Sequence, residues 1–308
     1  MLLTFLLGAA LSRVSLCAVA AAQQCAAARE VAGLLRLLLA ACASGIALLA
    51  LSRVLLAPEL LPRHLPIGGM LIMGSMLLAA GALLNGACYL GSVLYAGSGN
   101  ANYLFTLIGL GVGMRGIEWW ATPHDSPAFA APVSTPTVAA TLWWSGLLLY
   151  GLVVVLALRS GRTRGVALWP LLAGLLAGLV YACQPGWSYG HVIGSLARGD
   201  WRANTWLGNG AALALFAGAI AGSIAAGRWR WQRPSAVRVL RCLAGGALMG
   251  IAAMLIPGGN DMLLLWSIPG LALYGGVAYG IMLLVLVLMF GGAEIWRRRA
   301  RAATKLGT

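Results

Sequence analysis

Residues Arg241–Tyr279 read RCLAGGALMGIAAMLIPGGNDMLLLWSIPGLALYGGVAY, and this stretch decides the fold. Its apolar run is interrupted by PGGND at 257–261 and resumes at Met262–Trp266. Proline removes a backbone donor and paired glycines make a continuous helix costly, so the stretch predicts a broken helix. At membrane depth such a break is tolerated only where it lines a cavity or is buried in protein, and many transporters build a midplane site from one.

The composition is that of a polytopic helical membrane protein. The chain has 308 residues, of which 61% are hydrophobic and 9% charged, and its mean hydropathy is +0.88. Ordinary soluble domains are about 45–50% apolar and about 25% charged. Apolar segments of roughly 20 residues, the length that crosses a bilayer, recur along the whole chain. The 42 glycines suit close packing of helices inside a membrane.

The charges and cysteines exclude several classes of function. The net charge of +14 comes from bases in short loops and in the C-terminal tail, which is typical of orientation signals and not of a nucleic-acid surface. The six cysteines show no CxxC or Cys/His spacing, so we expect no disulfide framework and no metal site. No phosphate-binding loop, dinucleotide fingerprint or Ser/His/Asp arrangement can be assembled. We therefore expect no catalytic residues, no cofactor and a protein that is not an enzyme.

The pattern of apolar segments predicts an all-α fold with about nine transmembrane helices and four short half-helices. The expected spans are 1–16, 33–56, 68–84, 101–117, 142–158, 166–182, 207–226, 245–256 and 271–290. Breaks are expected near Cys17, Cys88, Trp187 and Asn260. Short helices are expected at 89–98 and 188–197, after the second and third breaks.

The order of span, break, half-helix and span recurs in both halves, which predicts two inverted repeats. The first repeat is expected at 1–117 and the second at 166–292. Between them, 118–165 would form an external loop and a linking transmembrane helix. Residues 293–308 would form a basic tail in the cytoplasm.

Three basic clusters set the expected orientation in a bacterial inner membrane. They lie at 159–164, 228–241 and 297–305, and two spans separate each neighbouring pair, so all three are expected in the cytoplasm. Counting spans back from them places the N-terminus outside and the C-terminus in the cytoplasm. This orientation requires the loop at 53–64 to be external although it holds two arginines.

The breaks are the candidate sites because a half-helix that begins inside the membrane directs unpaired N–H groups and a positive dipole end at its neighbours. Four such ends would favour an anion. Cys17 and Cys88 each follow a break, where a soft, weakly donating thiol would line a path for a soft anion or would simply be a small buried side chain. Asn260 and Asp261 would contact the anion, cap a helix, or do both.

Two further residues near the third break have two readings each. Trp187 would plug the path or mark a membrane interface. His191, four residues later, would carry protons or pack as a hydrogen-bonded side chain.

Four stretches carry a family resemblance. They are LLGAALSRVSLCAVA (6–20), GALLNGACYLGSVLYAGSGNANY (81–103), WSYGHVIGSLARGDWRANTW (187–206) and the opening stretch with its GGND motif (241–279). Together they resemble the YeeE/YedE family of inner-membrane sulfur-transport proteins.

The resemblance implies an hourglass pore built from inverted repeats, through which thiosulfate or a related sulfur anion passes along a line of cysteines. Cys17 and Cys88 fit the first two cysteine positions, with Gly86 in the Gly-x-Cys element. Gly258 and Gly259 belong to the GGND element, where Asn260 stands in place of a third cysteine.

The resulting prediction is a permease for a small inorganic sulfur anion, thiosulfate-like, which passes along weak donors at Cys17, Cys88 and Asn260. Its expected partners are this anion, the lipid bilayer and a cytoplasmic sulfur-carrier protein, with no nucleic acid. Two alternatives stay open. One is a non-transport membrane subunit that docks a soluble sulfur-relay protein on the basic loop 228–241, and the other is a permease or channel for another small anion.

Overall fold

The computed structural model describes residues 1–55, 57, 60–62, 65–120, 136–159, 164–200, 206–256 and 258–306. These residues are helical apart from short connections, and among them only one isolated bridge, between Asn100 and Gln232, pairs extended backbone. The predicted all-α class is confirmed for this part of the chain. The proline at 257, most of the expected external loop (121–135) and the centre of the 159–164 basic cluster lie outside the described residues.

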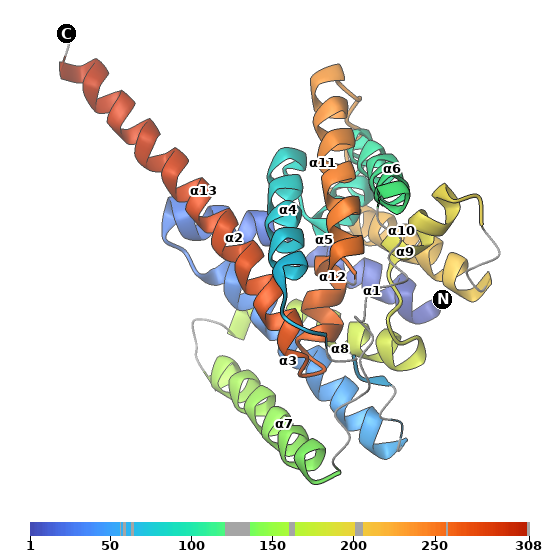
Figure 1. Ribbon diagram of the computed structural model, residues 1–308. Coiled ribbons are helices and arrows are strands. Elements are labelled where there is room, and N and C mark those ends of the chain that lie inside the picture. The colour runs from blue at the N-terminus through green and yellow to red at the C-terminus, as the bar shows by residue number, and fades with distance from the viewer. Residues whose placement is uncertain are drawn as a thin grey trace.

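The first part of the chain contains two broken helices, each followed by a continuous one. Figure 1 shows these elements in blue to green. They are α1 (Leu2–Arg13), α2 (Ala18–Ala28), α3 (Ala32–Val54), α4 (Gly69–Asn85), α5 (Tyr89–Gly97), the short 3₁₀ helix η2 (Ala101–Tyr103) and α6 (Leu104–Trp120).

After α7 (Pro136–Arg159), the second part follows the same order. Its elements are α8 (Arg164–Cys183), α9 (Tyr189–Ala197), α10 (Trp206–Ala225), α11 (Ala236–Leu255), α12 (Asn260–Met262), the π-helical segment η4 (Leu263–Ser267) and α13 (Leu273–Leu306). The expected short helices at 89–98 and 188–197 are therefore present with one-residue differences at their ends. The apolar run that resumes at Met262 belongs to a helix that begins two residues earlier, at Asn260, and continues as a π-helix.

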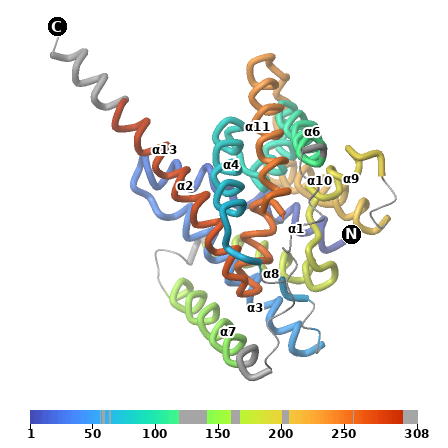
Figure 2. The backbone as a smooth tube through the Cα atoms, in the orientation of Figure 1, coloured from blue at the N-terminus to red at the C-terminus, as the bar shows by residue number. Residues whose placement is uncertain are grey.

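The helices pack in pairs that are distant in sequence. Helix α1 packs along α10, and α3 packs along α8. Helices α4 and α6 both pack on α11, while α13 contacts α2 and α4, and α9 contacts α6. Helix α7 lies at the edge of the molecule against α3, as Figure 2 shows. The breaks lie where these pairs meet, so they are enclosed by helices from both halves of the chain.

Within the part of the chain that the structure describes, seven helices are long and apolar enough to cross a membrane. Two of them, Leu2–Ala28 and Gly69–Gly97, include a break. Helix α6 has only 17 residues, and the apolar part of α8, Ala167–Cys183, is also shorter than a full span. Large apolar side chains such as Leu148 (70% exposed) cover the outer surface, as expected for contact with lipid. The chain is thus a multi-pass membrane protein, and the count of nine spans stays a prediction.

Glycines allow the closest helix pairs to touch through their backbones. A Cβ atom at Gly174 on α8 would lie 2.1 Å from the carbonyl oxygen of Ala40 on α3. A Cβ atom at Gly113 on α6 would lie 2.0 Å from the carbonyl oxygen of Ala247 on α11. Helices in a membrane associate by such close packing because lipid supplies no hydrophobic force to drive them together.

We therefore expect Gly174→Ala to lower the melting temperature of the purified protein, because overpacking a close contact costs about 1–3 kcal/mol. Gly151→Ala on α7 is the matched control, since no heavy atom lies within 4 Å of the added methyl group. Thermal unfolding in one detergent compares the two variants. Equal stability of both would contradict the close contact between α3 and α8.

Candidate functional site

Four short helical segments begin near one another at the breaks. The residue before each has extended backbone, and the first N–H groups of the segment that follows lack partners within it. These preceding residues are Cys17 before α2, Cys88 before α5, Ser188 before α9 and Gly259 before α12. Side-chain contacts across the breaks hold the four N-termini together.

The two cysteines predicted on the path touch each other. Cys88 Sγ lies 3.6 Å from Cys17 Sγ, and each residue is only 1% exposed. Cys88 Sγ also accepts a hydrogen bond of 3.3 Å from the Ala18 amide, so it caps the start of α2 from a neighbouring helix. A Cβ atom at Gly91 would lie 2.6 Å from Cys17 Sγ, which explains the absence of a side chain on that face of α5.

Asn260 joins the cysteines from the second half of the chain. Its Oδ1 accepts a hydrogen bond of 3.0 Å from the Tyr89 amide, the first N–H of α5. It therefore caps a neighbouring helix, whereas its own helix α12 starts after Gly259 without a side-chain cap. Asn260 Nδ2 has no hydrogen-bond partner although the residue is 0% exposed. A buried donor without a partner is costly, and it is a group that a bound ligand can satisfy.

Asp261 contacts the third break through Ser188. Ser188 Oγ donates a hydrogen bond of 2.7 Å to Asp261 Oδ2 and accepts one of 3.2 Å from the Gly190 amide, so it caps α9 and holds one carboxylate oxygen. The other oxygen, Oδ1, is buried without a hydrogen-bond partner. The sequence prediction centred this break on Trp187 and missed Ser188. A serine directly before an apolar helix is the N-cap signal that could have found it.

Tyrosines surround the junction, and sequence reasoning missed them as well. The rings of Tyr89 and Tyr189 lie 5.6 Å apart, and the Tyr189 hydroxyl donates to the Tyr89 carbonyl at 3.0 Å. The Tyr89 hydroxyl donates to the Met249 carbonyl at 3.3 Å. Tyr279 on α13 is also buried, and its hydroxyl has no hydrogen-bond partner. These rings fill the space around the polar groups and exclude water.

A separate network fixes the second break. Asn85 Nδ2 donates to the Ala87 carbonyl at 2.8 Å and to Ser92 Oγ at 3.0 Å. Its Oδ1 accepts from Thr106 Oγ1 at 2.7 Å. Asn85 is fully buried, so these bonds supply partners that water cannot reach. They hold Cys88 in position by anchoring the turn before it.

The three glycines predicted on the path, Gly86, Gly258 and Gly259, allow the backbone conformation and close packing of the breaks. Gly86 ends α4 with φ of 73°, and Gly258 has φ of 93°, a region that favours glycine. A Cβ atom at Gly259 would lie 2.8 Å from the ring of Tyr89. Glycine at 259 therefore lets the start of α12 approach α5 closely.

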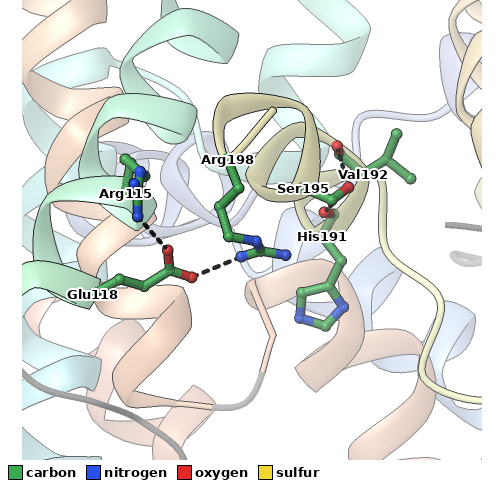
Figure 3. A network of polar contacts seen from close by, with 6 residues as sticks. All are labelled: Arg115, Glu118, His191, Val192, Ser195 and Arg198. Carbon is green, nitrogen blue, oxygen red and sulfur yellow. Dashed lines mark hydrogen bonds and ion pairs between the residues drawn. The ribbon is translucent and has the colours of Figure 1, made fainter. Parts of the chain in front are cut away.

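Trp187 and His191 take no part in the hydrogen bonds described above for this cluster, although His191 lies within electrostatic range of Asp261. Trp187 is half-buried, and its Nε1 donates to the Gly208 carbonyl on α10 at 3.3 Å. His191 lies on the exposed face of α9. Figure 3 shows its imidazole separate from the neighbouring ion pair of Arg198 and Glu118, whose atoms are 2.7 Å apart. Of the expected path residues, the structure thus brings together the two cysteines, Asn260 and the three glycines, with Asp261 beside them.

The assembled site combines several donors that suit an anion with one carboxylate, that of Asp261. Among the described residues, no group of three or more His, Cys, Asp and Glu side chains lies close enough together to hold a metal. The site offers thiols, an amide donor and helix N-termini, which together favour negative charge. A helical membrane protein with polar groups at converging helix breaks belongs to the class of membrane transport proteins.

The comparison with known families agrees with this class. The family model for sulphur transport matches residues 13–164 and again residues 162–288. The chain therefore belongs to the YeeE/YedE sulphur transport family, as its sequence motifs predicted. A search of curated proteins returned no match.

The Ser188 contact can be tested by its effect on stability. Ser188→Ala removes both the cap of α9 and the bond to Asp261, so we expect a loss of about 1–3 kcal/mol and a lower melting temperature. Ser145→Ala is the matched control, because Ser145 is exposed on α7 and bonds only to its own helix at Leu142. If the two variants melt together, Ser188 does not tie the break to Asp261.

The contact between the cysteines predicts a cross-link. Treatment of the purified protein with a small oxidant such as iodine should join Cys17 and Cys88 in a disulfide, because their sulfurs are already in contact. Mass spectrometry of a peptide digest would detect the linked peptides. The linked species should be absent from Cys88→Ala and retained in Cys183→Ala, whose thiol is exposed outside the cluster.

Proposed function

We propose that the chain is a permease for a small sulfur-containing anion of the thiosulfate type, which passes along Cys17, Cys88 and Asn260. The observation that carries this proposal is the buried Asn260 Nδ2, a donor without a hydrogen-bond partner on the side chain whose oxygen caps α5, the helix that begins directly after Cys88. Helix N-termini and N–H donors lower the cost of desolvating an anion. The thiols add weak contacts suited to a soft sulfur atom.

The arrangement of charge within the site fits this path. Ser188 holds one oxygen of Asp261 on the α9 side, while Asn260 and the thiols lie on the α5 side. The anion would accept hydrogen bonds on the α5 side, away from the carboxylate. Several weak contacts in succession allow both binding and release.

We further propose that residues 1–117 and 166–292 form inverted repeats around an hourglass pore, with about nine membrane-crossing helices. The packing supports this, because α1 on α10 corresponds to α8 on α3, and α2 on α13 corresponds to α9 on α6. The family model also matches the chain twice in succession.

The proposed setting is a bacterial inner membrane with the N-terminus outside. Residues 118–165 would provide the external loop and the linking helix, and the basic tail 293–308 would lie in the cytoplasm. The excess of basic residues in 228–241 and in the tail supports this orientation.

A second candidate function is docking of a soluble sulfur-carrier protein on the loop 228–235. This loop is fixed against the end of α5 through the Arg230 amide, which donates to the Ser98 carbonyl at 2.9 Å. It exposes Trp229 (42%) and Trp231 (62%) between arginines, and a rigid surface of aromatic and basic residues suits a protein partner. Binding of a carrier protein there would either accompany transport of the anion or be the function of the chain in place of transport.

Uptake into liposomes tests the permease. We expect Cys17→Ala and Cys88→Ala to reduce the uptake of ³⁵S-thiosulfate at least about tenfold, because each removes one of the successive contacts along the path. Cys25→Ala and Cys183→Ala are matched controls outside the cluster and should transport normally.

The same assay separates the alternatives. Normal uptake by both path variants at equal protein levels would contradict the thiol role. Uptake of other anions in place of thiosulfate would identify a different substrate. No uptake at all, together with capture of a carrier protein that is lost on neutralising the basic loop, would favour the docking subunit.

A further inference from the structure

A cavity of about 440 Å³ leads from the loop after α10 to the converging breaks. It lies between the ends of α1 and α5. Its lining includes Ser12, Ser15, Cys17, Tyr95, Arg228 and Arg230. The lining therefore includes two exposed arginines as well as Cys17, a thiol of the proposed path.

The charge of this lining is of one sign. Of the described residues that line the cavity, none is acidic. The Arg228 guanidinium donates one hydrogen bond to the Ser12 carbonyl oxygen, and the remainder of its five N–H groups are further donors. The Arg230 amide is bonded to the Ser98 carbonyl, so the backbone that carries this second guanidinium is fixed at the rim. Ser15 and Ser223 add hydroxyl groups to the wall, whereas the hydroxyls of Ser12 and Ser98 donate to the carbonyls of Ala9 and Tyr95.

Three other cavities have a different character. Those of about 640 Å³, 570 Å³ and 390 Å³ are lined mainly by Leu, Ile, Val, Ala and Gly on the outer faces of helices. Such surfaces suit lipid chains. The cavity at Cys17 is smaller than two of them, yet it is the one of these four that combines two arginines with a thiol.

The corresponding place in the second half of the chain is filled. Tyr95, which lines the cavity, stands six residues after the first residue of α5, and Trp266 stands six residues after the first residue of α12. Trp266 is stacked on Tyr181 with ring centres 6.0 Å apart, and its Nε1 donates to the Leu60 carbonyl at 3.0 Å. The indole is thus held by two neighbours at this position, whereas Tyr95 lines the cavity.

We propose that the cavity between Arg228, Arg230 and Cys17 is a binding site for a doubly charged sulfur oxyanion, with its oxygens at the arginines and its sulfur toward the thiol. Guanidinium groups match oxyanion oxygens through paired N–H donors, and a thiol suits a soft sulfur atom. Thiosulfate has both ends, whereas sulfate has only the first. The identity of the anion rests on the proposed permease function, but the existence of the site does not.

The charge of the cavity can be tested on the purified full chain by comparing the reaction rates of two thiol reagents of similar size and opposite charge. These are the anionic sulfonatoethyl and the cationic trimethylammonioethyl methanethiosulfonates. Peptide mass spectrometry follows their reaction at Cys17 and, in a separate variant, at Ser15→Cys, an exposed position in the same cavity. We expect the anionic reagent to react faster, and the ratio of rates to fall about tenfold in the double variant Arg228→Gln/Arg230→Gln.

Arg233→Gln is the matched control, because it removes the same charge from the same loop but does not line the cavity. Its ratio should equal that of the unmodified chain. The single variant Arg230→Gln keeps the Arg228 bond to Ser12, so it replaces the double variant if loss of that bond unfolds the protein. We expect it to lower the ratio of rates about threefold. An unchanged ratio in the arginine variants, or no reaction at either thiol, would overturn the proposal.

Calorimetric titration with sodium thiosulfate, sodium sulfate and phosphatidylglycerol vesicles separates a free oxyanion from a lipid headgroup, which shares the same chemistry. We expect thiosulfate to bind more tightly than sulfate, with a dissociation constant raised about tenfold in the double variant and unchanged in Arg233→Gln. If the vesicles slow the reaction of the anionic reagent with the thiols and thiosulfate does not bind, the proposal is overturned. Oxyanion binding that persists in a chain without thiosulfate uptake would refute the permease function alone.

Discussion

Backbone N–H groups at the starts of broken helices are the constraint on which this site depends. Inside a bilayer each unsatisfied backbone group costs several kcal/mol, so a helix cannot simply begin at mid-membrane. The molecule supplies partners from neighbouring half-helices. Cys88 accepts from the first amide of α2, and Asn260 accepts from the first amide of α5. The starts of α2 and α5 therefore depend on a neighbouring half-helix, whereas α9 is capped by its own Ser188.

This mutual capping gives the site its chemistry. Groups that cap one helix are also the groups that face the junction, so the same residues serve stability and ligand contact. Asn260 shows this most directly, because its oxygen is used in a cap and its nitrogen has no hydrogen-bond partner. An amide N–H is a stronger and more directional donor than a thiol, so asparagine in place of a third cysteine changes how an anion would be held.

The sequence predicted the parts of the fold that local chemistry decides. Apolar length indicated the helices, and the Gly and Pro clusters indicated the breaks, because these residues act on the backbone wherever they occur. The contact of Cys17 with Cys88 and the bond from Ser188 to Asp261 join residues far apart in the chain, and no local pattern specifies such partners. The family motifs pointed to the cysteines but not to Ser188 or to the tyrosines around the junction. Those residues become part of the site only through the packing of α5, α9 and α12.

The π-helical segment Leu263–Ser267 carries a mechanical consequence. The Ile268 amide bonds to the Leu263 carbonyl, five residues earlier, so this turn contains one residue more than an α-helical turn. The additional residue turns all that follows by about 100° around the helix axis relative to a regular helix. Trp266 lies within this wide turn, and its ring stacks on that of Tyr181. Conversion of the turn to a regular α-helix would therefore rotate the residues that follow it by the same angle relative to the half-helix that begins at Asn260.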